Sequence, residues 1–203
     1  MSDLVNRRAA QTRAEIVDAA LELFAAQGFD ATSMDQVADA AHVSRRTVYR
    51  YFPTKDDLVF ESPRKWLEVL NRTIDTRRPD EPTRDLLQRA VRDVARFIES
   101  DRDTVLNGFS ILVASPSLMA RHGRSDAEWS ARYLELLAPD VAHQSNGLLQ
   151  ATTAAMALVA ATNALIAVWA TSQPDGDLIA MTEIMFDQID SLWPASSRNP
   201  PIS

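Results

Sequence analysis

The sequence predicts an all-α protein of about nine helices. Along most of the 203-residue chain, apolar residues recur at the three- and four-residue spacing of helices, and strand-like alternation is nearly absent. Helix-capping residues precede the apolar runs, and breaks containing Pro or Gly separate them. With 46% hydrophobic and 24% charged residues, the composition is that of a globular protein.

Two N-terminal helices are predicted from capping residues and apolar spacing. The first is expected to start at a capping box over residues 12–15 and to stop at Gly28, which suits the left-handed position after a helix. The second is a short helix that starts after Ser33, with Gln36 in capping-box register, and ends near residues 40–42.

A third short helix follows after a tight turn. Ser44 is placed to cap it, and it is expected to run over residues 45–51 before a proline closes it. His42 stands in the turn, and His is among the residues that tolerate the left-handed conformation that such a turn needs. Val48 and Phe52 are expected to face the core.

Six longer helices account for the rest of the chain. Pro63 removes a backbone donor in the first of them, which is expected to kink there or to restart after Ser62. A break is also expected at residues 138–140, and residues 194–203 are expected to form a frayed tail. The predicted spans are residues 55–76, 82–100, 102–114, 117–137, 148–172 and 178–192.

Charge is unevenly distributed along the chain. The whole chain carries −7, yet residues 1–55 are neutral, so the net negative charge lies on residues 56–203. Residues 44–55 carry four basic and no acidic side chains. A local cationic patch on an otherwise acidic chain favours contact with nucleic acid, and a solvated surface is the alternative interpretation.

No cofactor, metal or catalytic site is predicted. Cysteine is absent, which excludes disulfides, thiolate nucleophiles and Cys-ligated zinc. Glycine-rich nucleotide fingerprints are missing, and the three histidines lack a metal-ligand spacing. A set of Ser115, His122 and Asp126 lacks the G-x-S-x-G turn of a serine hydrolase. We therefore expect a protein that is not an enzyme.

An uncharged stretch near the C-terminus raises the question of a membrane. Residues 151–170 are long enough to span a bilayer, but they are rich in Ala and Thr, contain Asn163 and lack closely flanking Lys or Arg. A helix buried in a core or a dimer interface has the same pattern. No apolar signal-peptide core follows Met1. The expectation is a soluble, cytoplasmic protein that does not enter the membrane.

The second and third predicted helices, separated by a tight turn, describe a helix-turn-helix. In this motif one helix enters the major groove and presents its N-terminal side chains to base edges. Arg is suited to bridge O6 and N7 of guanine, while hydroxyls bind phosphates or bases. The candidate DNA contacts on and after the third helix are Ser44, Arg45, Arg46, Thr47, Tyr49, Arg50, Tyr51 and Lys55.

The motif carries a dense resemblance to a known family. Residues 12–58 are similar to the DNA-binding domain of the TetR family of bacterial transcriptional regulators, most clearly in Val-Ser-Arg-Arg-Thr-Val-Tyr-Arg-Tyr-Phe-Pro-Thr-Lys-Asp-Asp-Leu. His42 departs from the Gly that the family usually has in the turn. The resemblance implies base contacts by Arg45, Arg46 and Arg50. It implies phosphate contacts by Thr47, Tyr49, Tyr51 and Lys55, with Thr32 or Ser33 holding another phosphate.

The resemblance also implies how the chain is divided. It implies a DNA-binding domain over residues 1–58 and a ligand-binding and dimerisation domain over 59–193, ahead of the tail at 194–203. Aromatic residues on helices that line an inducer cavity in the family are candidates for ligand binding, with ordinary core packing as the alternative for each. These are Trp66, Phe97, Phe109, Trp129, Tyr133 and Trp169, and Asn163 is a polar candidate.

Two apolar stripes on the last two helices predict a homodimer. In the family these helices form a four-helix bundle with those of a second copy, and stripes at three- and four-residue spacing suit such a seam. The candidate interface residues are Leu158, Ala161, Leu165 and Val168 on one helix and Met181, Met185 and Ile189 on the other.

Together these features predict a ligand-responsive transcriptional regulator. We expect a repressor that binds double-stranded, pseudo-palindromic operator DNA as a homodimer and is released by a small apolar ligand. The alternative is a helical small-molecule-binding protein or enzyme with a vestigial helix-turn-helix. A vestigial motif would have lost its cationic charge, whereas Arg45, Arg46, Arg50 and Lys55 are all present.

Overall fold

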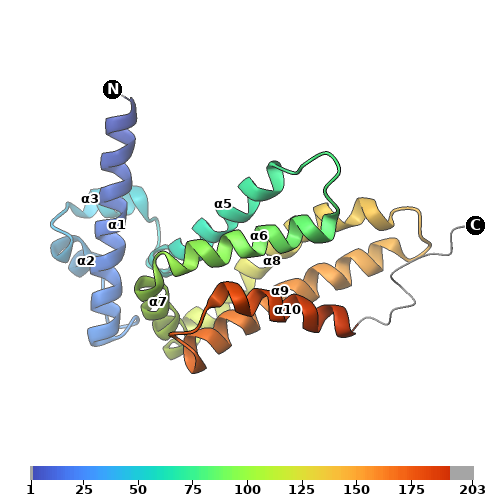
Figure 1. Ribbon diagram of the computed structural model, residues 1–203. Helices are drawn as coiled ribbons and strands as arrows, with labels where there is room; N and C mark the ends of the chain where they lie inside the picture. Colours follow the sequence, from blue (N-terminus) through green and yellow to red (C-terminus); the bar gives the residue numbers. More distant parts are fainter. Residues whose placement is uncertain (1, 193–203) are drawn as a thin grey trace, which may run out of the picture. The chain divides into compact units, whose positions relative to one another are not determined.

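All regular structure in residues 2–192, which the computed structural model describes, is α-helical (Figure 1). The all-α prediction is confirmed, and the predicted tail at 194–203 lies outside the described residues. The described residues form ten helices: α1 (Ser2–Gln27), α2 (Met34–Ala40), α3 (Arg45–Tyr51), α4 (Asp56–Val59), α5 (Glu61–Asp75), α6 (Thr83–Glu99), α7 (Arg102–Ala114), α8 (Pro116–Val141), α9 (Gly147–Ser172) and α10 (Leu178–Leu192).

These helices belong to two compact units. The first unit contains the residues up to Trp66 together with Asp101–Ser125, and the second contains Leu67–Ser100 together with the residues from Asp126 onward. Helices α5 and α8 therefore begin in the first unit and end in the second. The predicted functional boundaries at residues 58 and 193 describe roles rather than packing, and they stay a prediction.

The core of the first unit is built around α1. Helix α1 packs against α2, α4 and α7, and α2 packs against α3. One buried cluster joins these helices. It contains Ile16 and Phe24 of α1, Val37 of α2, Val48 of α3 and Phe52, which directly follows α3. The predicted inward orientation of Val48 and Phe52 is confirmed, because both are fully buried.

The first helix is longer than expected. Gly28 ends α1 as predicted, with a φ of 88° and its N–H donating to the Phe24 carbonyl at 2.9 Å. The predicted start at residues 12–15 is wrong, because α1 already begins at Ser2. The preceding Arg, Ala and Gln residues are good helix formers, so the helix continues through Thr12 instead of starting there.

Two prolines account for the other differences from the predicted helices. The single helix expected over 55–76 is two helices, and the second restarts after Phe60 rather than after Ser62. Pro63 then lies in the first turn of α5, where its missing N–H leaves no helical hydrogen bond unmade. The break expected at residues 138–140 is absent, and α8 continues past Pro139 to Val141. That proline lies in the last turn, so it removes one hydrogen bond without ending the helix early.

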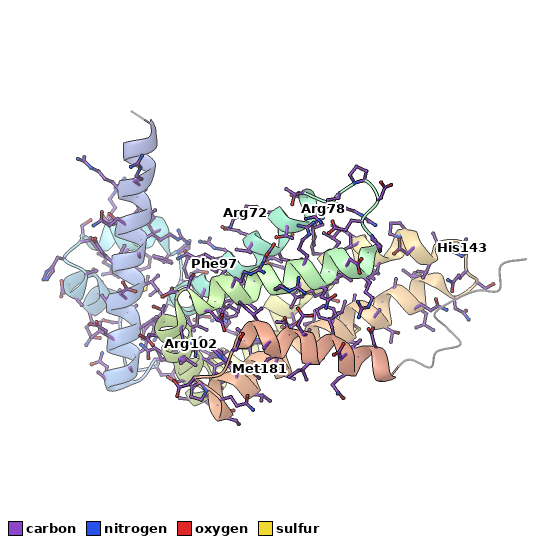
Figure 2. The ribbon with its side chains drawn as sticks, viewed as in Figure 1. Arg72, Arg78, Phe97, Arg102, His143 and Met181 are labelled. Atoms are coloured by element: carbon purple, nitrogen blue, oxygen red, sulfur yellow. The ribbon has the colours of Figure 1, made fainter. Side chains whose placement is uncertain are left out.

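The second unit is organised around α6, α9 and α10. Helix α10 packs along both α6 and α9, and Figure 2 labels Phe97 on α6 and Met181 on α10. Salt bridges Arg84–Asp190 and Arg92–Glu183 join α6 to α10 beside the apolar contacts. Helix α9 is the one described helix that is long and apolar enough to cross a membrane. That is weak support for a membrane span, because it rests on length and composition alone; α9 buries residues such as Ala155 and Trp169, while most of its apolar stretch is exposed.

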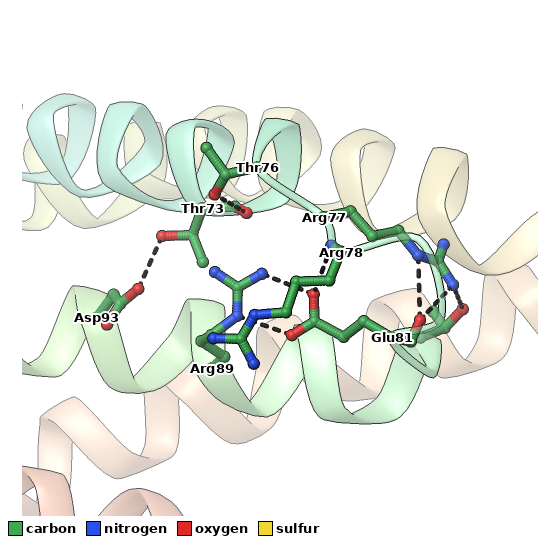
Figure 3. A network of polar contacts seen from close by, with 8 residues as sticks. Thr73, Thr76, Arg77, Arg78, Glu81, Arg89 and Asp93 are labelled. Atoms are coloured by element: carbon green, nitrogen blue, oxygen red, sulfur yellow. Dashed lines mark hydrogen bonds and ion pairs between the residues drawn. The ribbon is translucent and has the colours of Figure 1, made fainter.

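An ion-pair network closes the loop between α5 and α6 (Figure 3). Arg89 donates to both carboxylate oxygens of Glu81, at 2.8 and 2.7 Å, and the Arg78 backbone N–H donates to the same carboxylate at 3.2 Å. The hydrogen bonds from Arg89 outweigh the opposing effect of burial, and with Arg78 they lower the pKa of Glu81 from 4.5 to about 2. The loop is thus fixed by a carboxylate that stays charged.

Candidate nucleic-acid interface

Helices α2 and α3 of the first unit present a strip of exposed side chains. The buried Val48 fixes one side of α3 against the core, so the opposite side of the helix is solvent-exposed. We call this strip the recognition surface; its exposed members are Asp35, Arg45, Arg46, Tyr49 and Arg50. Four of these are among the six contacts predicted on α3, the other two, Thr47 and Tyr51, being half-buried, and Asp35 of α2 is an addition.

Capping residues fix where the two short helices begin. Ser33 Oγ accepts from the Gln36 N–H at 3.2 Å, and Gln36 Oε1 accepts from the Ser33 N–H at 2.8 Å, which completes the predicted capping box. Ser44 Oγ accepts from the Thr47 N–H at 3.1 Å and contacts Thr47 Oγ1 at 2.8 Å. His42 between them has a φ of 52°, as the turn was expected to require.

The three arginines of α3 differ in what they contact. Arg45 forms a salt bridge with Asp35, with Nε 2.9 Å from Oδ1, and its guanidinium lies 5.5 Å from the Tyr49 ring centroid. The Arg50 guanidinium lies 4.9 Å from the centroid of the half-buried Tyr51 ring. Arg46 is exposed and makes no ion pair or hydrogen bond with the described part of the chain. Arg46 and Arg50 therefore offer cationic donors without an acidic partner in the described part of the chain, whereas Arg45 shares its guanidinium with Asp35.

Two other predicted phosphate contacts are already engaged inside the first unit. Lys55 Nζ donates to the carbonyls of Phe29 at 2.7 Å and Thr32 at 2.9 Å, with a longer contact to Asp30 at 3.4 Å. The Thr32 side chain is buried, and its Oγ1 donates to the Gly28 carbonyl at 2.8 Å. Both residues therefore stabilise the connection between α1 and α2.

A buried ion pair joins the C-terminal end of α3 to α1 and α5. Arg13 of α1 donates to Glu61 of α5 through Nε at 2.5 Å and NH2 at 2.6 Å, and through NH1 to the Tyr51 carbonyl at 3.3 Å. The same guanidinium lies 4.5 Å from the Phe52 ring centroid. Arg13 of α1 therefore joins the C-terminal end of α3 to α5.

The charge of Glu61 is maintained despite its burial. Its side chain is 2% exposed, and burial alone would raise the pKa of its carboxyl group. The hydrogen bond from Arg13 and the charges of Arg13, Arg64 and Lys65 outweigh burial, so the pKa of Glu61 lies below its ordinary value. This ion pair went unnoticed in the sequence because its partners are 48 residues apart.

The candidate ligand-binding residues are divided between the two units. Trp66 and Phe109 belong to the first unit, and both are half-buried. The other five belong to the second unit; Tyr133 and Trp169 are fully buried, whereas Phe97, Trp129 and Asn163 are half-buried. Trp169 donates its indole N–H to the Gly176 carbonyl at 3.1 Å, and the Asn163 amide donates to Asp126 at 3.0 Å.

Tyr133 of α8 is the most unusual of these residues. It lies 6.2 Å from Trp129, ring centroid to ring centroid, and is fully buried. The neighbouring Thr162 hydroxyl donates to the Leu158 carbonyl at 2.8 Å, and the Tyr133 hydroxyl makes no hydrogen bond of normal geometry within the described residues. Burial raises the pKa of Tyr133, so the phenol stays protonated and able to donate.

The candidate dimer residues fall on two sides of α9 and α10. Leu158, Leu165 and Met185 are buried inside the second unit, and Ala161, Met181 and Ile189 are half-buried. Val168 is exposed. It belongs to an uncharged strip that we call the outer face of α9, whose exposed members are Leu149, Thr153, Met156, Ala160, Ala164 and Val168. Ile184 of α10 is also exposed.

The described residues contain no cluster of three or more His, Asp or Glu side chains that would hold a metal ion.

The sequence did not reveal the roles of Asp35, Arg13 and Glu61. An acidic residue in the first turn of a helix carries no distinctive signal by itself, and the pairs Asp35–Arg45 and Arg13–Glu61 form only in the tertiary structure.

Family models match both parts of the chain. Residues 16–61 match the model for bacterial regulatory proteins of the tetR family, and residues 81–194 match the model for the MftR C-terminal domain. Over 143 residues the chain is 32% identical to MftR of Mycobacterium tuberculosis, described as a mycofactocin biosynthesis transcriptional regulator. That alignment covers 70% of each protein.

Solved structures have the same fold. FadR of Thermus thermophilus, a transcriptional repressor in complex with lauroyl-CoA, aligns with a TM-score of 0.64 and 22% identity, covering 94% of this chain and 98% of that one. SmeT, in complex with triclosan, aligns with a TM-score of 0.66 and 18% identity, covering 95% and 96%. With a helix-turn-helix, matches along both parts and a relative of this similarity, the chain belongs to the TetR family of bacterial regulatory proteins and is a transcriptional regulator.

Proposed function

We propose that this regulator is a cytoplasmic repressor that binds a pseudo-palindromic operator as a homodimer and leaves it when a largely apolar effector binds. The recognition surface is the observation that carries the proposal. Helix α3 is capped, packed on a buried core and exposes Arg45, Arg46 and Arg50. That combination supports direct reading of the major groove. A vestigial motif would have no reason to keep three exposed arginines on one helix.

The proposed DNA contacts divide by what their side chains are free to do. Arg45, Arg46 and Arg50 are assigned to bases, and Tyr49, Tyr51 and Thr47 to phosphates. Ser33 and Ser44 sit at helix N-termini, where backbone N–H groups suit a phosphate. Thr32 and Lys55 are assigned an indirect role, because their donors already bind backbone carbonyls.

Homodimerisation is proposed through the outer face of α9 together with Ile184 of α10. Exposed apolar side chains at helical spacing on an uncharged helix need a partner surface, and a second copy offers the same stripe by symmetry. Small residues such as Ala160 and Ala164 would let two α9 helices approach closely. Leu158, Leu165 and Met185 would support this face from beneath instead of touching the partner.

An effector site is proposed in the second unit near Tyr133. Beside the Thr162 hydroxyl, which already donates to the Leu158 carbonyl, the buried Tyr133 hydroxyl makes no hydrogen bond of normal geometry within the described residues, and a ligand oxygen that accepts its proton would supply one. The aromatic and aliphatic side chains of the unit suit an apolar ligand body. The structures of FadR with lauroyl-CoA and SmeT with triclosan support the same chemistry, an apolar body that carries an oxygen.

Selection of duplexes from a random-sequence pool by the purified full chain tests the DNA-binding part. Enrichment of a sequence with two related half-sites is expected. No enrichment by a folded protein would refute the proposal and favour the ligand-binding or enzymatic alternative.

Displacement from the enriched duplex tests the effector part. Lauroyl-CoA and triclosan serve as probes, and fluorescence anisotropy reports the release. We expect at least one probe to lower duplex affinity, and Tyr133→Phe to weaken that response while duplex affinity without the probe stays unchanged. A response of the same strength in Tyr133→Phe would contradict the assignment of the hydroxyl.

The dimer is tested by Met156→Asp on the outer face of α9. We expect monomers in sedimentation velocity and loss of tight duplex binding. Ala127→Asp, at an exposed position of α8, is the matched control and should remain dimeric. A dimeric Met156→Asp variant would refute the assigned interface.

A further inference from the structure

One acidic side chain lies within the cationic recognition surface. Asp35 is in the first turn of α2, and its carboxylate pairs with Arg45, the first residue of α3. Arg45 Nε lies 2.9 Å from Asp35 Oδ1, and NH1 donates to Oδ2 at 3.1 Å. The Asp35 side chain is 57% exposed and the Arg45 side chain 65% exposed, so the pair faces solvent on the side of the molecule assigned to DNA.

A carboxylate in the first turn of α2 favours the helix dipole by about 0.3–1 kcal/mol, but that effect does not require the contact with Arg45, and affinity for DNA does not account for the carboxylate either. Ion pairs between exposed side chains contribute little to the free energy of unfolding. A carboxylate also repels the phosphates of an approaching duplex and lowers the favourable charge that drives binding. Asp35 therefore weakens DNA binding in general, and its contribution has to lie in something other than attraction.

The contacts of Arg45 indicate what that contribution is. A free arginine has a long, flexible side chain and reaches phosphates as readily as bases. Here Asp35 contacts the guanidinium through Nε and NH1, and the Tyr49 ring lies 5.5 Å from the guanidinium carbon. NH2 keeps donors that have no partner in the described part of the chain. Arg46 and Arg50 have no acidic partner there, so this restraint distinguishes Arg45 from the other two arginines of α3.

We propose that Asp35 is a positioning residue that makes Arg45 selective for its base. Held by Asp35, the guanidinium presents its free donors in one orientation, which suits the fixed acceptors of a guanine edge. If Arg45 turned to a phosphate instead, Asp35 would be left unpaired beside the DNA, which penalises sites that lack the right base. Asp35 thus lowers affinity for all DNA and lowers it most for wrong sequences. This inference rests on the proposed function.

The test compares two acidic residues of the same helix. Asp39 lies one turn after Asp35, is also exposed and forms no ion pair within the described residues. Asp35→Asn and Asp39→Asn remove the same charge, but only the first one releases Arg45. Anisotropy titrations use the duplex that the wild-type chain enriches from a random pool, and the set of its single-base-pair variants. The specificity ratio is the affinity for the enriched duplex divided by that for each variant.

Asp35→Asn is expected to bind the non-matching duplexes more tightly. At the base pair read by Arg45, its specificity ratio should fall by about 5- to 150-fold, the range associated with one bidentate base contact. Asp39→Asn should tighten binding to every duplex equally and leave each ratio within about twofold of the wild type, because a lost charge alone is indifferent to sequence. In an Arg45→Ala background, Asp35→Asn should no longer change the ratio.

The outcomes separate this inference from the proposed function. If the wild-type chain enriches no sequence, the proposed function fails, and this inference fails with it. If the wild type is selective but Asp35→Asn keeps every ratio, Asp35 does not position Arg45 and only the inference is overturned. An equal loss of specificity in Asp39→Asn overturns it as well, because charge rather than contact would then be responsible.

Discussion

The recognition surface and the outer face of α9 are both exposed, but they are built on different principles. The first lies on two seven-residue helices whose ends are fixed by capping side chains and whose function depends on individual arginines. The second lies on a 26-residue helix without a charged residue, where only the shape and apolar character of the whole strip matter. A surface of the first kind depends on single side chains and their partners, whereas a surface of the second kind needs only a matching strip.

The largest expected effect comes from removing the support beneath the recognition surface. Phe52→Ala deletes a fully buried ring that also lies against Arg13, and we expect a loss of about 3–5 kcal/mol in the free energy of unfolding. Tyr49→Ala, which removes a 40% exposed ring from α3 just before Phe52, is the control and should change stability by less than about 1 kcal/mol. Urea denaturation of both variants measures the difference. Equal losses would mean that α3 is not anchored through Phe52.

The buried ion pair between α1 and α5 should have the next largest effect. Glu61→Gln leaves the Arg13 guanidinium without its anion, and we expect a loss of about 2–3 kcal/mol, below the value for a fully buried pair because Arg13 is 22% exposed.

The same pair should make stability depend on pH. The pKa of Glu61 is lowered in the folded state, so its stabilisation is present above the pKa of the unfolded chain. It is lost as the pH falls below about 4.5 toward the folded value. Denaturation of wild type and Glu61→Gln from pH 7 to 3 checks this. The difference between them should shrink with acid; a constant difference would contradict a charged Glu61.

Removing the charge of Lys55 should lower the stability of the fold, whereas removing the charge of Arg46 should lower the affinity for DNA. Lys55→Met leaves the carbonyls of Phe29 and Thr32 without their donor, and we expect a loss of about 1–2 kcal/mol in stability with little change in the salt dependence of DNA binding. Arg46→Met should leave stability within about 0.5 kcal/mol and weaken binding to the enriched duplex by roughly 1–3 kcal/mol. If Lys55→Met reduced the slope of log affinity against log salt by about one, Lys55 would contact a phosphate directly.

The smallest effect is expected in the loop between α5 and α6 of the second unit. The pKa of Glu81 is about 2, below its ordinary value of 4.5, so its pairing with Arg89 contributes to stability fully above about pH 4.5. That contribution should disappear as the pH falls toward 2. Thermal melts of wild type and Glu81→Gln should therefore differ at pH 6 and converge near pH 2. A gap in melting temperature that widened in acid would contradict this sign.

Local chemistry explains which features the sequence could predict. The starts of α2 and α3 follow from Ser33, Gln36 and Ser44, which act within a few residues of themselves, and their prediction was correct. The start of α1 was misjudged because a capping pattern at Thr12 also fits the interior of a longer helix. The break at Pro139 was misjudged because a proline close to a helix end costs one hydrogen bond only.

The partners of the site residues could not be predicted in the same way. Arg45 with Asp35, Lys55 with the carbonyls after α1, and Arg13 with Glu61 form across turns or between distant helices. The orientation of α9 posed a further problem, because a helix that is apolar all round does not reveal which stripe faces its own core. Leu158 and Leu165 were therefore assigned to the interface although they are buried within the protomer.

The most direct test of the account varies the spacing between the two half-sites of the enriched duplex. If two recognition surfaces are held by one dimer through α9, they read half-sites about one DNA turn apart, roughly 34–36 Å. Inserting about half a turn of duplex should then reduce the affinity, measured by anisotropy, to that of a single half-site. The same affinity at every spacing would contradict the account, because the two recognition surfaces would then bind DNA independently of each other.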